Sequence, residues 1–119
     1  MPTNRSTPTS LFSYGTLQQP AVQLELFGRQ VEGEPDRLPG YRRGTVTLAD
    51  PEGDGPEVHA IAIPSGHPAD EIAGTLLWLT EAELAAADAY EPDAYRREMV
   101  TMRSGRRAWA YVQASPVSV

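Results

Sequence analysis

The stretch Leu11-Phe12-Ser13-Tyr14-Gly15-Thr16-Leu17 lies near the start of this 119-residue chain. Its first four residues have the pattern of a short, mostly apolar strand, and Gly15 interrupts that strand with a polar loop. A glycine after a strand lets the backbone turn with its N–H groups pointing outward, where they can bind a carboxylate or a developing oxyanion. The sequence leaves open which of these two charges is bound. Taken in isolation, the loop would be an ordinary strand-ending turn.

A second informative stretch lies further along, around Asp88-Ala89-Tyr90-Glu91-Pro92. The preceding Thr80-Glu81-Ala82-Glu83 matches a capping box, so a helix is predicted to begin near Glu81 and to stop at Pro92. Residues three and four apart share a helix face, which aligns Leu84, Ala87, Asp88 and Glu91. Because the apolar end of this stripe must face the core, both carboxylates are predicted to point inward or toward a cavity rim. For Asp88 the favoured role is structural.

The remaining chain contains signals for one more helix and several strands. Residues 1–10 are rich in Ser, Thr and Pro and are expected to be a disordered tail, leaving residues 11–119 as a single domain. A helix is predicted over 20–27, with Gly28 at its end. Gly74 suggests a bulge, and Ser104-Gly105 suggests a hairpin turn. Further strands are predicted at Tyr41–Leu48, Val58–Ile63, Ile72–Leu79, Tyr95–Met102 and Arg107–Gln113.

These elements together predict an α+β domain. Five to six short strands with two helices fit most simply into a small mixed β-barrel or a strongly curved sheet, with the helices packed on it. No apolar run approaches the roughly 18 residues of a membrane span, and the first ten residues lack a secretory signal, so a cytoplasmic location is expected.

Composition excludes several kinds of chemistry. The chain has no cysteine, and all ten of its basic residues are arginine. Thiolate nucleophiles, cysteine-bound metals, Schiff-base lysines and the phosphate-loop lysine are therefore excluded. The net charge of −6 argues against a nucleic-acid partner. Catalysis, if present, depends on Glu, Asp, His, Tyr, Ser, Thr, Arg and the backbone.

The arginines occur partly in adjacent pairs on predicted strands. Adjacent strand residues face opposite sides, so one member of each pair should point outward and the other toward a partner or a site. Solvated strand faces are the favoured interpretation for Arg42-Arg43 and Arg106-Arg107. Arg96 or Arg97 lies beside the Glu91 segment, where a structural ion pair is favoured over a role in orienting a carboxylate.

An ordered series of short motifs carries a family resemblance from about Leu11 to Val112. In type, order and spacing the motifs resemble the gamma-glutamylcyclotransferase-like superfamily, in particular its small AIG2-like, gamma-glutamylamine cyclotransferase-type domain. This resemblance implies the same α+β fold. Two positions depart from the usual pattern, with Ala87 in place of a leucine and Pro92 in place of a glycine. The motifs are Tyr14-Gly15-Thr16-Leu17, Leu38-Pro39-Gly40-Tyr41, Gly74-Thr75-Leu76-Leu77, and Asp88 with Glu91 followed by Tyr95-Arg96.

The resemblance implies an enzyme that converts a gamma-glutamyl amine or gamma-glutamyl amino acid to 5-oxoproline and the free amine. The substrate's α-amine attacks its own γ-carbonyl, with Glu91 as general acid and base. The substrate-binding residues would be Tyr14, the N–H groups of Gly15, Thr16 and Leu17, and Tyr95. For Tyr95, packing of the ring on the core is an equal alternative. No metal or other cofactor is implied, the partner is a small molecule rather than a nucleic acid or a membrane, and the oligomeric state stays open.

Two other functions fit parts of the pattern. The chain could be a non-catalytic small-molecule binding domain that retains the pocket. A two-carboxylate hydrolase using Asp88 and Glu91 is less favoured, because side chains one helical turn apart lie on one wall, whereas glycosidase carboxylates flank the bond they cleave.

Overall fold

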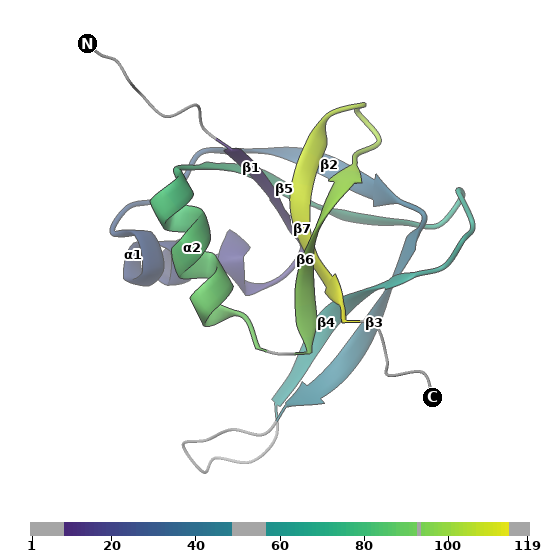
Figure 1. The fold of residues 1–119 in the computed structure, drawn as a ribbon, viewed down its shortest axis with the longest axis horizontal. Helices are drawn as coiled ribbons and strands as arrows, with labels where there is room; N and C mark the ends of the chain where they lie inside the picture. The colour runs from purple at the N-terminus through teal and green to yellow at the C-terminus, as the bar shows by residue number, and fades with distance from the viewer. Residues whose placement is uncertain (1–8, 49–56, 93, 115–119) are drawn as a thin grey trace.

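The computed structural model describes residues 9–48, 57–92 and 94–114. Within these residues the chain forms seven strands, two α-helices and one short 3₁₀ helix. Figure 1 shows both α-helices on the same side of the main sheet, with the hairpin of the third and fourth strands projecting beyond it. The elements are β1 (Thr9–Ser13), η1 (Thr16–Gln18), α1 (Pro20–Phe27), β2 (Gly33–Pro39), β3 (Tyr41–Leu48), β4 (Glu57–Pro64), β5 (Glu71–Leu79), α2 (Glu81–Tyr90), β6 (Tyr95–Thr101) and β7 (Arg107–Gln113).

The strands form a five-stranded sheet in the order β2-β5-β1-β7-β6 and a separate two-stranded ribbon, β3-β4. Strands β1 and β7 run parallel, and the other pairs are antiparallel. The α+β prediction is confirmed, with a curved sheet rather than the barrel alternative, since the sheet does not close in the described residues. Its strands number seven instead of five or six, because β2 was not predicted.

Strand β2 escaped prediction because its sequence, GEPDRLP, contains two prolines, two acids and no alternation. It lies at the edge of the sheet and pairs only with β5. Pro35 is paired with Thr75 in this ladder. The other edge of β2 has no neighbouring strand with which to form hydrogen bonds. Edge strands tolerate proline and charge for this reason, so a polar segment can still be a strand.

Strand β1 begins two residues earlier than predicted. Thr9 and Ser10 pair with Leu79 and Trp78 of β5, and the Ser10 hydroxyl donates to the carbonyl oxygen of Arg107 over 3.0 Å. The expected tail over residues 1–10 is therefore wrong for residues 9 and 10. Residues 1–8 lie outside the described part of the chain.

Gly74 forms no bulge, because the register between β2 and β5 is continuous through the Asp36–Gly74 pair. The glycine is needed for space. A Cβ atom there would collide with the Ser13 carbonyl oxygen and lie 2.7 Å from Cζ of Phe12. The absent side chain lets β1 and β5 approach closely at the end where β1 leaves the sheet.

Both faces of the five-stranded sheet are covered. Consecutive residues of β1 belong to different clusters, because Phe12 packs toward the β3-β4 ribbon and Leu11 packs toward the helices. On the helix side, Leu84 and Ala87 of α2 are buried as the predicted stripe required. The predicted capping box is confirmed, with Thr80 Oγ1 accepting from the Glu83 N–H at 3.1 Å and Glu83 Oε1 accepting from the Thr80 N–H at 2.9 Å.

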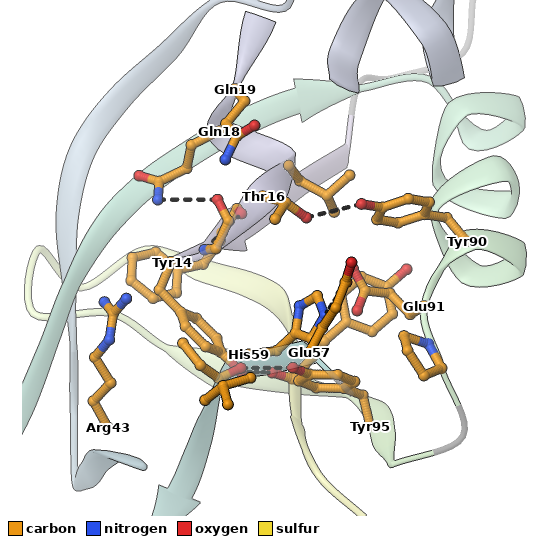
Figure 2. A pocket seen from close by; sticks show the side chains of 18 of the residues that line it. Tyr14, Thr16, Gln18, Gln19, Arg43, Glu57, His59, Tyr90, Glu91 and Tyr95 are labelled. Carbon is orange, nitrogen blue, oxygen red and sulfur yellow. Dashed lines mark hydrogen bonds and ion pairs between the residues drawn. The ribbon is translucent and has the colours of Figure 1, made fainter. Parts of the chain in front are cut away.

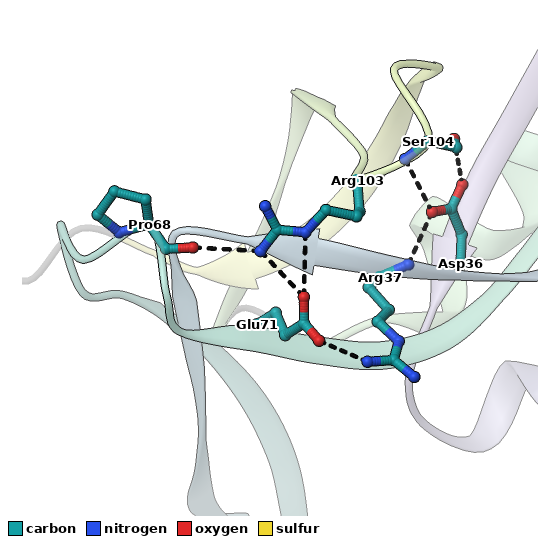
Figure 3. A network of polar contacts seen from close by, with 6 residues as sticks. All are labelled: Asp36, Arg37, Pro68, Glu71, Arg103 and Ser104. Carbon is teal, nitrogen blue, oxygen red and sulfur yellow. Dashed lines mark hydrogen bonds and ion pairs between the residues drawn. The ribbon is translucent and has the colours of Figure 1, made fainter.

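A polar network fixes the far end of the sheet (Figure 3). Glu71 of β5 accepts from Arg37 of β2 at 2.6 Å and from Arg103, in the β6-β7 turn, at 3.0 and 3.1 Å. The Arg103 N–H also donates to the Arg37 carbonyl oxygen at 2.8 Å, and the Ser104 hydroxyl donates to Asp36 at 2.6 Å. These bonds join the turn beyond β6 to the opposite edge strand, so the sheet is strongly curved.

The predicted hairpin between β6 and β7 is confirmed. Gly105 has a φ of 92°, and its N–H donates to the Met102 carbonyl oxygen at 2.9 Å. Among the described residues, no helix has the length and apolar content needed to cross a membrane.

Candidate active site

A cavity of about 1030 Å³ opens where β1 leaves the sheet. Three parts of the chain form it: the loop after β1, the end of α2 with the tyrosines of β6 and β7, and the inner face of the β3-β4 ribbon (Figure 2). The cavity is lined by Phe12, Ser13, Tyr14, Gly15, Thr16, Leu17, Gln18, Gln19, Pro20, Arg43, Glu57, Val58, His59, Ala60, Tyr90, Glu91, Pro92, Tyr95 and Tyr111. All six sequence-predicted site residues therefore line one cavity.

The loop after β1 becomes the short helix η1, which begins just after Gly15. The first N–H groups of a helix have no acceptor within it, and in the described residues we find no acceptor for those of Thr16 and Leu17. The buried Leu17 side chain anchors the loop in the core beneath the helices. The arrangement leaves adjacent backbone donors in the cavity wall.

Gly15 has a negative φ of −133°, so the turn does not require a left-handed backbone. A Cβ atom at this position would meet no protein atom within 4 Å. Glycine here leaves the backbone uncovered where the loop lines the cavity, which permits close approach by a ligand.

Glu91 caps the C-terminus of α2 and has an extended backbone, with φ −77° and ψ 136°. Its N–H still donates to the Ala87 carbonyl oxygen at 3.0 Å, but the following Pro92 excludes a helical conformation. The side chain is partly buried in the cavity wall. This burial raises the pKa of the Glu91 carboxyl from its ordinary value of 4.5 to about 7. Near neutral pH the group can therefore both accept and donate a proton.

Asp88 does not share this environment, and the prediction that both carboxylates point inward or toward a cavity rim is wrong for it. Its side chain is 43% exposed and lies outside the cavity lining. The carboxylate accepts from the Tyr111 hydroxyl at 2.7 Å and pairs with Arg97 at 3.2 Å. Asp88 thus holds a cavity-lining tyrosine in place, which agrees with the structural role favoured for it. The predicted structural ion pair of the Arg96-Arg97 segment is confirmed, and the two-carboxylate hydrolase loses its geometric basis.

The Tyr14 hydroxyl is fully occupied by the protein. It donates to the Tyr111 carbonyl oxygen at 2.6 Å and accepts from the Ala62 N–H at 2.9 Å. Burial raises the pKa of this phenol far above its ordinary value. Tyr14 therefore connects the β3-β4 ribbon to β7 and presents its ring, rather than a free hydroxyl, to the cavity.

Tyr95 of β6 reaches the same strand, β4, where its hydroxyl donates to the Ala60 carbonyl oxygen at 2.6 Å, two residues from the Ala62 N–H that Tyr14 binds. Burial, and then the nearby Glu91 carboxylate, raise the pKa of Tyr95 to about 12. The ring packs partly against the cluster beneath the helices. The oxygen of this hydroxyl can still accept a hydrogen bond, which is the remaining way for it to contact a ligand.

Several lining residues were not predicted from the sequence. Tyr90 shares a 2.9 Å hydrogen bond with the Thr16 hydroxyl, which joins the end of α2 to the loop, and His59 Nε2 lies 3.1 Å from Glu57 Oε1 on the ribbon (Figure 2). Tyr90 could have been proposed from its position next to Glu91. The ribbon residues have no local signal, because only the placement of β3 and β4 against the sheet brings them to the cavity.

A model of the family described as gamma-glutamyl cyclotransferase, AIG2-like, matches residues 11–118. The chain belongs to this family. The resemblance identified from the sequence is thereby confirmed. Comparison of this AIG2-like chain with curated proteins gave no match.

Solved structures share the fold of this AIG2-like chain at low sequence identity. An Arabidopsis thaliana protein with a solution structure is 23% identical, with a TM-score of 0.70, and the alignment covers 95% of this chain and 75% of the other. A yeast gamma-glutamyl cyclotransferase specific to glutathione is 12% identical, with a TM-score of 0.69 and coverage of 91% and 69%. A second Arabidopsis protein is 21% identical, with a TM-score of 0.63. The alignment covers 95% of this chain and 66% of the Arabidopsis protein, so this chain spans just under two thirds of that protein's length.

Proposed function

We propose that the protein is a cyclotransferase that converts a gamma-glutamyl amine or gamma-glutamyl amino acid to 5-oxoproline and the free amine. The α-amine nitrogen attacks the γ-carbonyl carbon, a new C–N bond closes the five-membered ring, and the original amide C–N bond breaks. The attacking nitrogen loses two protons on its way from ammonium to lactam N–H, one before the attack and one after it. The departing nitrogen gains one proton to leave as the amine and a second to become an ammonium, so the protons balance. Nucleophile and electrophile belong to the same molecule, so this acyl transfer needs neither a protein nucleophile nor a metal.

The observation that carries the proposal is the partly buried Glu91 with its pKa of about 7. The base must take a proton from the substrate's α-ammonium, a weak acid. Raising the carboxyl pKa from 4.5 to about 7 lowers the cost of that transfer by about 3.4 kcal/mol, at about 1.4 kcal/mol for each pKa unit. At neutral pH a larger fraction of Glu91 is protonated than of an unperturbed carboxyl, so more of it can donate a proton to the departing nitrogen.

The loop supports the same assignment. The N–H groups of Gly15, Thr16 and Leu17 would receive the anionic part of the gamma-glutamyl head group, and the rings of Tyr14 and Tyr95 would enclose it. The separation of roles is chemically coherent, because the donors stabilise negative charge while Glu91 moves protons. Asp88 and Arg97 would act indirectly, by holding Tyr111 in the cavity wall.

The test is 5-oxoproline release from a panel of gamma-glutamyl amino acids and gamma-glutamyl amines. The native protein, Glu91→Gln and Glu25→Gln would be compared. Glu25 is an exposed residue of α1, so its substitution makes the same chemical change away from the cavity. We expect turnover by the native protein and by Glu25→Gln, and a loss of about 10² or more in Glu91→Gln, as expected for removal of a general acid and base.

Unchanged turnover in Glu91→Gln would remove that residue from the mechanism. No product from the native protein across the panel, together with a thermal shift by 5-oxoproline, would instead favour the non-catalytic binding domain.

A further inference from the structure

Two adjacent arginines of β3 have different surroundings. Arg43 lines the cavity, whereas Arg42 does not. Arg43 is paired in register with Ala62 of β4, and the Ala62 N–H donates to the Tyr14 hydroxyl. This places Arg43 on the ribbon beside Tyr14, and in Figure 2 it lies on the other side of Tyr14 from Glu91. Both arginines are exposed, as the interpretation of solvated strand faces predicted, but the sequence did not show that Arg43 also lines the cavity.

Arg43 shares the ribbon wall of the cavity with Glu57 and His59. Glu57 and His59 pair with each other at 3.1 Å. Across the part of the chain that the structure describes, no carboxylate lies within ion-pairing distance of Arg43. Arg43 thus presents a positive charge to the cavity that no carboxylate of the described residues pairs with.

Resting on the proposed function, we propose that Arg43 binds a carboxylate on the leaving group, so that the preferred substrates are gamma-glutamyl amino acids rather than gamma-glutamyl amines. In a gamma-glutamyl amino acid the nitrogen of the departing residue is an uncharged amide. The carboxylate of the departing amino acid is then the only charge on the leaving group, unless the side chain of that amino acid is ionised. A gamma-glutamyl alkylamine has no charge there and gains nothing from Arg43.

The size of the cavity supports placing the leaving group against the ribbon. Its volume of about 1030 Å³ is at the upper end of ordinary ligand pockets, which is more than a glutamyl group fills. The head group uses the loop donors and Glu91, which leaves the ribbon wall for the rest of the substrate. Val58, 67% exposed on the same wall, offers apolar contact to an aliphatic side chain.

The test compares two ligands that differ by one carboxylate: gamma-glutamyl-alanine and gamma-glutamyl-ethylamide, whose leaving groups are alanine and ethylamine. Their dissociation constants would be measured by calorimetry on Glu91→Gln, in which turnover is removed, and on that variant carrying Arg43→Gln or Arg42→Gln. Arg42→Gln is the matched control, one residue away and outside the cavity lining. Circular dichroism would verify that each variant is folded.

We expect Arg43→Gln to raise the Kd of gamma-glutamyl-alanine about tenfold, the size of one charge-assisted hydrogen bond, and to leave that of the ethylamide within about twofold. Arg42→Gln should change neither. Equal weakening of both ligands would overturn the proposal, because Arg43 would then bind a group that they share. An unchanged Kd for gamma-glutamyl-alanine, or no binding of either ligand, would overturn it as well. Turnover by the native protein is measured separately, so a failure of the cyclotransferase assignment is distinguishable from a failure of the Arg43 assignment.

Discussion

Substitution of Glu91 by glutamine should stabilise the folded protein, and increasingly so as the pH rises. The folded state raises the pKa of the Glu91 carboxyl from 4.5 to about 7, so it binds this proton more tightly than the unfolded chain does. Between these two pKa values the native protein therefore loses stability with increasing pH, and above about 7 the loss is complete. With about 1.4 kcal/mol for each pKa unit, the loss between about pH 5 and pH 8 is about 2.5 kcal/mol.

The assay is urea unfolding of the native protein, Glu91→Gln and the exposed control Glu25→Gln at both pH values. The free energy of unfolding of Glu91→Gln, relative to the native protein, should be about 2.5 kcal/mol higher at pH 8 than at pH 5. Any pH-independent cost of a buried amide cancels in this comparison. Glu25→Gln should show no comparable change.

The same ionisation should govern catalysis in the opposite sense. The carboxylate form is the base, so kcat/KM should rise with pH through an apparent pKa near 7.

Equal stability differences between Glu91→Gln and the native protein at pH 5 and pH 8 would show that Glu91 titrates normally. That result would refute both the burial argument and the proton-transfer energetics based on it.

Three further substitutions test individual parts of the cavity. Tyr14→Phe should lower the free energy of urea unfolding by about 1 to 3 kcal/mol, because the buried Ala62 N–H loses its acceptor; an unchanged value would contradict the bridging role. Gly15→Ala should leave the melting temperature unchanged, since its Cβ meets no protein atom, yet raise KM about tenfold or more by crowding the ligand; an unchanged KM would place the substrate elsewhere. Tyr90→Phe removes the hydrogen bond to Thr16, worth about 1 kcal/mol, and should lower kcat/KM about fivefold while thermal unfolding stays normal. A loss of Tm that accounts for the lost activity would indicate a structural role only.

Local signals in the sequence predicted the elements whose energetics are local. The Thr80 capping box and the Gly105 hairpin depend on residues within one turn of each other, and both are present in the structure. Strand β2 was missed because its stability comes from pairing with β5, more than 30 residues away, and not from its own pattern. The position of Arg43 in the cavity was not predicted for the same reason, because it depends on how the whole ribbon packs against the sheet.

The helix stripe predicted that Asp88 and Glu91 both point inward or toward a cavity rim, and only Glu91 lines the cavity. Asp88 is within α2 and keeps the direction that the helix dictates, which leads to the surface and to Arg97. Glu91 precedes Pro92, and the clash of the proline ring with a helical preceding residue forces its backbone into the extended conformation. The extended ψ turns only the chain that follows, since the φ of −77° and the N–H bond to Ala87 keep the Glu91 side chain where the last helical turn places it. That place is the cavity wall, where burial raises the carboxyl pKa. Pro92 thus ends the helix directly after the proposed base and leads the chain into β6, whose Tyr95 lines the same cavity.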